Sequence, residues 1–103
     1  MPTLSTHVLD TARGRPAAGV PVHLLDASGE ALADAVTDDD GRVASLGDDL
    51  SAGVYTVRFS VGSYQPEGFY PEVAVTFTVA DGESHYHVPL LLSPYGYSTY
   101  RGS

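Results

Sequence analysis

The sequence predicts an all-β fold, either a sandwich or a barrel, with at most one short helix. Short runs rich in Val, Leu, Tyr, Phe and Thr recur along the chain, and clusters of Asp, Gly, Pro and Ser separate them. The runs are too short and too evenly spaced for a helical protein. With 103 residues the chain fits a single domain spanning residues 1–103. A domain of this size has a thin core, which association between copies could extend.

Seven segments are predicted to form strands. In chain order they are Leu4 to Asp10, Val20 to Asp26, Ala31 to Thr37, Val54 to Val61, Glu72 to Ala80, His85 to Leu92 and Tyr95 to Arg101. The clusters ARGRPAAG, DASGE, TDDDG, GDDLSAG and ADGES stand between them as turns, because Asp and Gly accept turn geometry. A helix could fit only in Ser63 to Phe69, where Pro66 and Gly68 oppose a helix interior.

Side-chain alternation assigns a face to each polar residue of a strand. In Val54 to Val61 one face is apolar and is predicted to be buried: Tyr55, Val57, Phe59 and Val61. In Leu4 to Asp10, His7 shares the less apolar face with Ser5 and Leu9. In His85 to Leu92 the outward face carries His85, His87, Pro89 and Leu91. An outward face that mixes imidazoles with apolar side chains is typical of an interface or a cleft, such as a subunit contact that encloses a pocket.

Composition excludes several classes of function. Five Arg, no Lys and thirteen acidic residues give a net charge of -8, the wrong sign for holding nucleic acid. The absence of Cys rules out disulfides and thiolate zinc sites. No apolar run approaches the length of a membrane span, and the first ten residues lack the features of a secretory signal. We therefore expect a soluble protein with no nucleic-acid or membrane partner, and its RGS ending, unlike SKL, favours the cytoplasm.

Three segments carry a resemblance to a known family: THVLDTARGRPA, TDDDGR and YHVPLLLSPYGYSTYRGS. From about Thr6 to Ser103 the chain resembles the 5-hydroxyisourate hydrolases, the transthyretin-related enzymes of urate breakdown. The YRGS end is the most specific part, since it separates these hydrolases from the hormone-carrying transthyretins. The resemblance implies a transthyretin-like sandwich of two four-stranded sheets, about eight strands in all, and a homotetramer whose central channel holds the active sites. The segment SYQPEGFYPEV departs from the pattern, because the family commonly has a helix there.

The resemblance also implies the site residues. Its catalytic residues fall on His7, Arg42, His87 and Ser103, with Tyr100 and Arg101 completing the tail motif. It implies no metal and no cofactor. The implied reaction opens 5-hydroxyisourate to 2-oxo-4-hydroxy-4-carboxy-5-ureidoimidazoline.

The chemistry of these residue types suits that reaction. Opening a cyclic amide needs an activated water, a stabilised oxyanion and a proton for the departing nitrogen. His7 and His87 suit the proton transfers near neutrality, although the sequence leaves open which is acid and which is base. Arg42 can hold an oxyanion or a flat anionic heterocycle through paired hydrogen bonds. Ser103 offers a hydroxyl and the terminal carboxylate, and either could orient water. For substrate binding we add Ser98, Tyr100 and Arg101 to His7 and Arg42.

Other interpretations remain open. His85 and His87 together with His7 could form a three-imidazole zinc site. If there is no zinc site, His85 is not assigned a catalytic role, although it could tune the imidazole of the neighbouring His87. A carrier of the transthyretin type shares the same fold, so the fold alone does not separate transport from catalysis. The acidic run Asp38 to Asp40 is interpreted as a solvated turn and His23 as structural.

Overall fold

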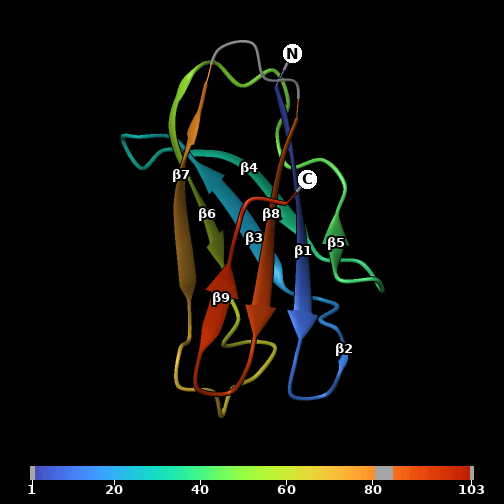
Figure 1. Ribbon diagram of the computed structural model, residues 1–103. Coiled ribbons are helices and arrows are strands. Elements are labelled where there is room, and N and C mark those ends of the chain that lie inside the picture. Colours follow the sequence, from blue (N-terminus) through green and yellow to red (C-terminus); the bar gives the residue numbers. More distant parts are fainter. Residues whose placement is uncertain (1, 81–84, 103) are drawn as a thin grey trace.

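The computed structural model describes residues 2–80 and 85–102, and within them nine strands form two sheets (Figure 1). The strands are β1 (Thr3–Asp10), β2 (Arg15–Pro16), β3 (Pro21–Leu25), β4 (Ala31–Val36), β5 (Arg42–Val43), β6 (Gly53–Phe59), β7 (Val73–Val79), β8 (His85–Leu92) and β9 (Tyr97–Thr99). The predicted all-β, two-sheet fold is confirmed. The first sheet has the order β2-β1-β8-β9, with β5 also paired to β1, and the second has the order β4-β3-β6-β7.

The centre of the first sheet joins the two ends of the chain. β1 and β8 run parallel over their whole length, from Thr3 opposite His85 to Asp10 opposite Leu92. All the other strand pairs are antiparallel in the described part of the chain. On its other side β1 pairs with β5 near its middle and with β2 near its end. This arrangement places residues from three distant parts of the sequence side by side on one sheet.

The predicted segments overlap seven of these strands, of which β1 and β6 begin one residue earlier than predicted. The two strands that were not predicted, β2 and β5, have two residues each. The last predicted segment, Tyr95 to Arg101, is shortened to β9. A turn takes up its start, because the Ser93 backbone N–H and side-chain hydroxyl both donate to the carbonyl of Gly96.

The segment from Ser63 to Phe69 forms turns and no helix. The N–H of Gln65 donates to the carbonyl of Val61, as in one helical turn, but Pro66 follows and cannot continue the pattern. The predicted limit of at most one short helix therefore holds across residues 2–80 and 85–102. In that same part of the chain, no helix has the length and apolar character that crossing a membrane requires.

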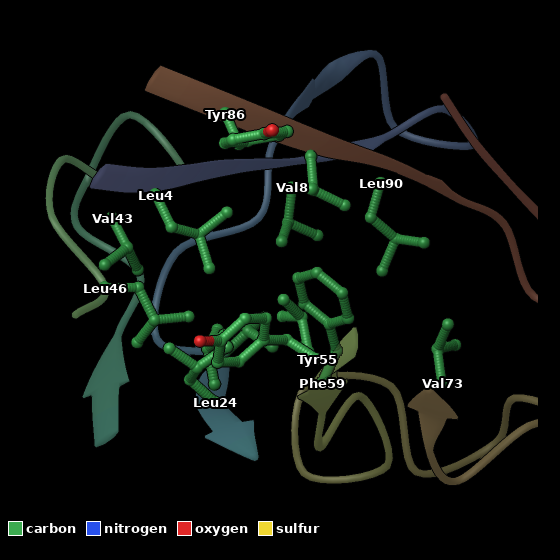
Figure 2. Packing of buried hydrophobic residues seen from close by; sticks show 14 of the residues in the cluster. Leu4, Val8, Leu24, Val43, Leu46, Tyr55, Phe59, Val73, Tyr86 and Leu90 are labelled. Carbon is green, nitrogen blue, oxygen red and sulfur yellow. The ribbon is translucent and has the colours of Figure 1, made fainter. Parts of the chain in front are cut away.

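The core lies between the sheets and is built from alternate positions of the strands (Figure 2). Tyr55, Val57 and Phe59 of β6 are buried, as the alternation predicts. They meet Leu4 and Val8 of β1 and the apolar face of β8, formed by Tyr86, Val88, Leu90 and Leu92. Burying each such side chain stabilises the fold by about 1.5–3 kcal/mol. With one face of β1 and β8 held in the core, their alternate residues must face outward.

One margin of the sandwich is hollow. β7 ends the second sheet and β9 ends the first, and a cavity of about 300 Å³ lies between these two edges. Its lining is mainly apolar: Val75, Phe77, Thr78, Tyr86, Val88, Thr99, Tyr100 and Arg101. The guanidinium of Arg101 lies over the ring of Tyr86, with its Cζ atom 4.5 Å from the ring centre, in a cation–π contact.

Candidate active site

Three of the four predicted catalytic residues come together on the outer face of the first sheet. Arg42 of β5 lies directly opposite His7 of β1. On the other side of β1, His87 of β8 lies opposite Ser5, two positions along the strand from His7. Arg42 and His7 both act electrostatically on His87, so the three side chains are near neighbours. Figure 1 shows the three strands β5, β1 and β8 side by side.

A tight turn sets the position of Arg42. One carboxylate oxygen of Asp38 accepts the N–H groups of Asp40 and Arg42, each at 2.9 Å. Gly41 has a φ of 74°, and its carbonyl accepts the N–H of Val8 at 2.7 Å. A Cβ atom at Gly41 would lie only 2.4 Å from the carbonyl oxygen of Val8. The TDDDGR segment is therefore a shaped turn that holds Arg42 against β1.

We predict that Gly41→Ala lowers stability more than Gly14→Ala does. Both glycines have positive φ, which costs an L-residue about 1–2 kcal/mol. Only at Gly41 would the new methyl group also meet backbone, since nothing lies within 4 Å at Gly14. The clash adds about 1–3 kcal/mol. Urea unfolding of the two variants measures the difference, and equal losses would contradict the proposed close approach.

His7 is held by the same turn. Its Nε2 lies 2.9 Å from the carbonyl oxygen of Asp40, and because a carbonyl only accepts, Nε2 carries the proton and donates. The neutral imidazole then has its lone pair on Nδ1. The turn thus fixes the tautomer of His7 as well as the place of Arg42.

His87 is half-buried and has a different environment. Its Nδ1 lies 2.7 Å from the hydroxyl oxygen of Ser5, while its Nε2 makes no hydrogen bond to the described residues. Burial lowers the pKa of His87 below the ordinary value of 6.5, and the charges of Arg42, His7 and His85 lower this pKa further. His87 is therefore mainly neutral at pH 7 and can accept a proton.

The end of the described chain lies against His87. The N–H of Gly102 donates to the carbonyl of His87 at 2.8 Å, and a Cβ atom at Gly102 would lie 2.4 Å from Cδ2 of the His87 ring. In Figure 1 the chain turns across β8 after β9. Ser103, the fourth predicted catalytic residue, lies outside the described residues.

The guanidinium of Arg42 is exposed and, among residues 2–80 and 85–102, makes no hydrogen bond or ion pair. Its donors are thus available to a ligand.

The predicted binding residues at the end of the chain lie apart from Arg42. Ser98 is opposite Leu91, further along the outer face. Tyr100 and Arg101 line the edge cavity, and Arg101 stacks on Tyr86, a residue of the core face. Within one chain Arg101 is therefore not gathered with His7, and its substrate contact stays a prediction.

The zinc alternative gains no support from the geometry. In the described ranges no three His, Asp or Glu side chains form a group that could hold a metal ion. Both ring nitrogens of His85 are already in hydrogen bonds, with the hydroxyls of Thr3 and Ser5. His23, interpreted as structural, pairs with Asp34 on the second sheet.

Sequence reasoning missed two contributions to this site: the carbonyl of Asp40 and the hydroxyl of Ser5. Ser5 could have been suspected, because alternation already places it on the same face as His7. Its contact with His87 depends on the parallel pairing of β1 and β8, which no local sequence pattern predicts.

Comparisons with known proteins agree with this arrangement. A model of the HIUase/Transthyretin family matches residues 4–102. The 5-hydroxyisourate hydrolase of Caulobacter vibrioides is 45% identical, with 100% of both chains covered. That of Deinococcus radiodurans is 46% identical, with 99% of this chain and 97% of that protein covered. The uric acid degradation bifunctional protein TTL of Arabidopsis thaliana is 41% identical, but this chain spans only 37% of its length.

Two solved structures are similar over almost the whole chain. The 5-hydroxyisourate hydrolase of Klebsiella pneumoniae has a TM-score of 0.90 and 40% identity, covering 98% of this chain and 99% of that one. Sea bream transthyretin in complex with thyroxine has a TM-score of 0.89 and 32% identity, covering 96% and 93%. The resemblance carried by the three motifs is confirmed, and the chain belongs to the HIUase/Transthyretin family.

Proposed function

We propose that this protein hydrolyses 5-hydroxyisourate to 2-oxo-4-hydroxy-4-carboxy-5-ureidoimidazoline by general acid and base catalysis. The observation that carries the proposal is the meeting of two imidazoles and a guanidinium, unpaired among residues 2–80 and 85–102, on one face beside Gly102. Relatives that carry the name 5-hydroxyisourate hydrolase match over their full length and support the same substrate.

In this mechanism His87 is the base. Its neutral ring takes a proton from water through Nε2, and the resulting hydroxide attacks the ring carbonyl of the substrate. The C–N bond then breaks, and His7 in its protonated form delivers a proton to the departing nitrogen. One proton is taken up by His87 and one is given by His7, so the site returns to its starting charge when a proton passes between them through solvent.

Arg42 holds the developing oxyanion or the anionic heterocycle. Its fork of N–H donors suits a planar anion, and the acidity of the whole chain makes a local cation necessary to attract one. Ser103, with either its hydroxyl or the terminal carboxylate, orients the attacking water in this proposal.

The assembly proposed is a homotetramer with its sites where subunits meet. Within one chain His7, Arg42 and His87 lie on an open sheet face, and the edge strands β7 and β9 border a mainly apolar cavity. Both features fit surfaces that another copy would cover. Sedimentation equilibrium tests this assembly, since four chains of 10.8 kDa should sediment together, and a monomer at assay concentration would contradict it. A cytoplasmic location also stays a proposal.

A carrier is the second candidate, because the structure resembles sea bream transthyretin in complex with thyroxine. Two imidazoles and an Arg that has no partner in the described part of the chain favour catalysis over carriage, for which an apolar lining would serve better. Ultraviolet absorbance separates the two candidates: freshly made 5-hydroxyisourate should disappear faster with the protein than in buffer. An unchanged decay rate together with binding of an aromatic ligand would support the carrier.

A chelator tests whether catalysis is metal-free. Loss of turnover with a chelator, restored by zinc, would contradict metal-free catalysis.

The pH dependence follows from the environment of His87. Because the pKa of His87 lies below 6.5, the base stays mainly neutral as pH falls to about that value, and kcat/KM should decline at lower pH, where the base becomes protonated. The stability that depends on neutral His87 should be complete above pH 6.5, where the unfolded chain also holds the ring neutral, and should be lost as pH falls through the folded-state pKa. Rates from about pH 5 to about pH 9 test this prediction, and a flat profile would contradict it.

A further inference from the structure

A row of hydrogen-bonded side chains leads from His87 to the surface. The hydroxyl oxygen of Ser5 lies 2.7 Å from Nδ1 of His87 and 2.9 Å from Nε2 of His85. On its far side, Nδ1 of His85 lies 2.6 Å from the hydroxyl oxygen of Thr3. His85 is exposed whereas His87 is half-buried. The row therefore connects a shielded imidazole with solvent.

The strand register produces this row. Thr3 lies opposite His85 and Ser5 lies opposite His87 in the parallel pair of β1 and β8. Because alternate residues share a face, all four side chains stand on the outer side of the first sheet. The ring of His85 then bridges the two hydroxyls of β1. Each link has the length of a good hydrogen bond.

The row has two consistent directions of proton donation. In the first, Nδ1 of His87 donates to Ser5, Ser5 donates to Nε2 of His85, and Nδ1 of His85 donates to Thr3. Nε2 of His87 is then bare and can act as a base. In the second, every bond is reversed, Ser5 donates to Nδ1 of His87, and Nε2 of His87 carries the proton. The heavy atoms keep their places in both.

We propose that Ser5 and His85 form a proton relay that returns protonated His87 to the neutral state during a turnover, an inference that rests on the proposed function. A proton enters at Nε2 of His87 from the attacking water. The Nδ1 proton of His87 passes to Ser5, the Ser5 proton passes to Nε2 of His85, and the Nδ1 proton of His85 leaves through Thr3 to solvent. One proton enters and one leaves, so each side chain ends neutral and the row stands in the second direction. Nε2 of His87 then gives its proton to solvent while a proton from solvent enters through Thr3, and the row returns to the first direction with Nε2 bare. Ser5 and His85 are thus positioning and relay residues that need not touch substrate.

Substitutions test the relay through kcat. Ser5→Ala breaks the row and should lower kcat about 10- to 100-fold with little change in KM, whereas Ser5→Thr keeps the hydroxyl and should retain most of the rate. Thr76→Val, which removes a hydroxyl bonded to Thr56 on the second sheet, is the matched control and should leave kcat unchanged.

Chemical rescue gives a readout that a structural role would not move. His85→Ala should lower kcat by a similar factor, and imidazole in the buffer should restore part of it, because the site of His85 is open to solvent. His23→Ala removes a paired imidazole from the second sheet and should show neither the loss nor the rescue.

A measurement independent of turnover completes the test. Among the described residues, the charged or titratable groups that act on His87 are Arg42 on β5, His7 on β1 and His85 on β8. Removing His85 removes one repelling charge, so the pKa of His87 followed by nitrogen NMR should rise in His85→Ala. Wild-type kcat in Ser5→Ala, no imidazole rescue, or an unmoved titration would overturn the relay. A wild-type protein that leaves the decay of 5-hydroxyisourate unchanged would instead contradict the proposed function. The NMR titration would still show whether His85 lies close enough to His87 to change its pKa.

Discussion

His87→Asn should lower kcat/KM for 5-hydroxyisourate by about 10²- to 10⁴-fold, the usual contribution of a positioned general base. Asparagine can place a polar atom where Nδ1 of His87 stands, so the hydrogen bond to Ser5 can survive. It cannot take a proton at the position of Nε2. His87→Asn should therefore lower the rate while changing the urea unfolding midpoint very little. Stopped-flow absorbance of freshly made substrate measures the rate, and urea unfolding measures the stability.

The matched control for His87→Asn is His23→Asn. His23 is also a strand histidine with a hydrogen-bonded Nδ1, but it faces away from the site on the second sheet and pairs with Asp34. His23→Asn should keep the wild-type rate. Near-wild-type turnover in folded His87→Asn would remove His87 from the mechanism.

Arg42→Gln should lower kcat/KM by about 10²- to 10³-fold, as the loss of an oxyanion donor typically does. The side chain of Arg42 is exposed and its guanidinium is unpaired within the described ranges, so the substitution should change stability little. Arg42→Lys should recover only part of the rate, because an ammonium keeps the charge but lacks the planar fork. Steady-state kinetics of both variants give the two losses.

Arg58→Gln is the control for Arg42. Arg58 pairs with Glu72 on the second sheet, away from the site, and its loss should leave turnover unchanged. Equal activity of Arg42→Gln and the wild type would contradict a role for Arg42 in holding charge. A loss in Arg42→Gln that Arg42→Lys fully restores would assign the role to charge alone.

Local pattern was enough to predict most of the fold. Alternation in β6 and β8 identified the buried residues, because burial of one face requires apolar side chains at every second position. The strands β2 and β5 were missed because two residues are too few to show an alternating pattern. Both form only because they pair with β1. Pro66 argued against a helix between Ser63 and Phe69, but the sequence left the point open and the structure decided it.

The candidate site was predictable as a set of residues but not as an arrangement. The motifs indicated His7, Arg42 and His87, and alternation gave the outer face. Their proximity depends on the parallel contact of β1 with β8 and on the turn at Gly41, which are tertiary features. For the same reason the bond between Ser5 and His87 came only with the structure, as did the stacking of Arg101 on Tyr86.

The most direct test is a crystal structure of the protein with an unreactive, flat, anionic purine analogue. Two places in the described part of the chain are compared as sites for such a ligand: the outer face of the first sheet and the cavity between the edges of β7 and β9. The account predicts density between His7, Arg42 and His87, with the Arg42 fork on the anionic edge of the ring. Density confined to the edge cavity, with both histidines untouched, would contradict it.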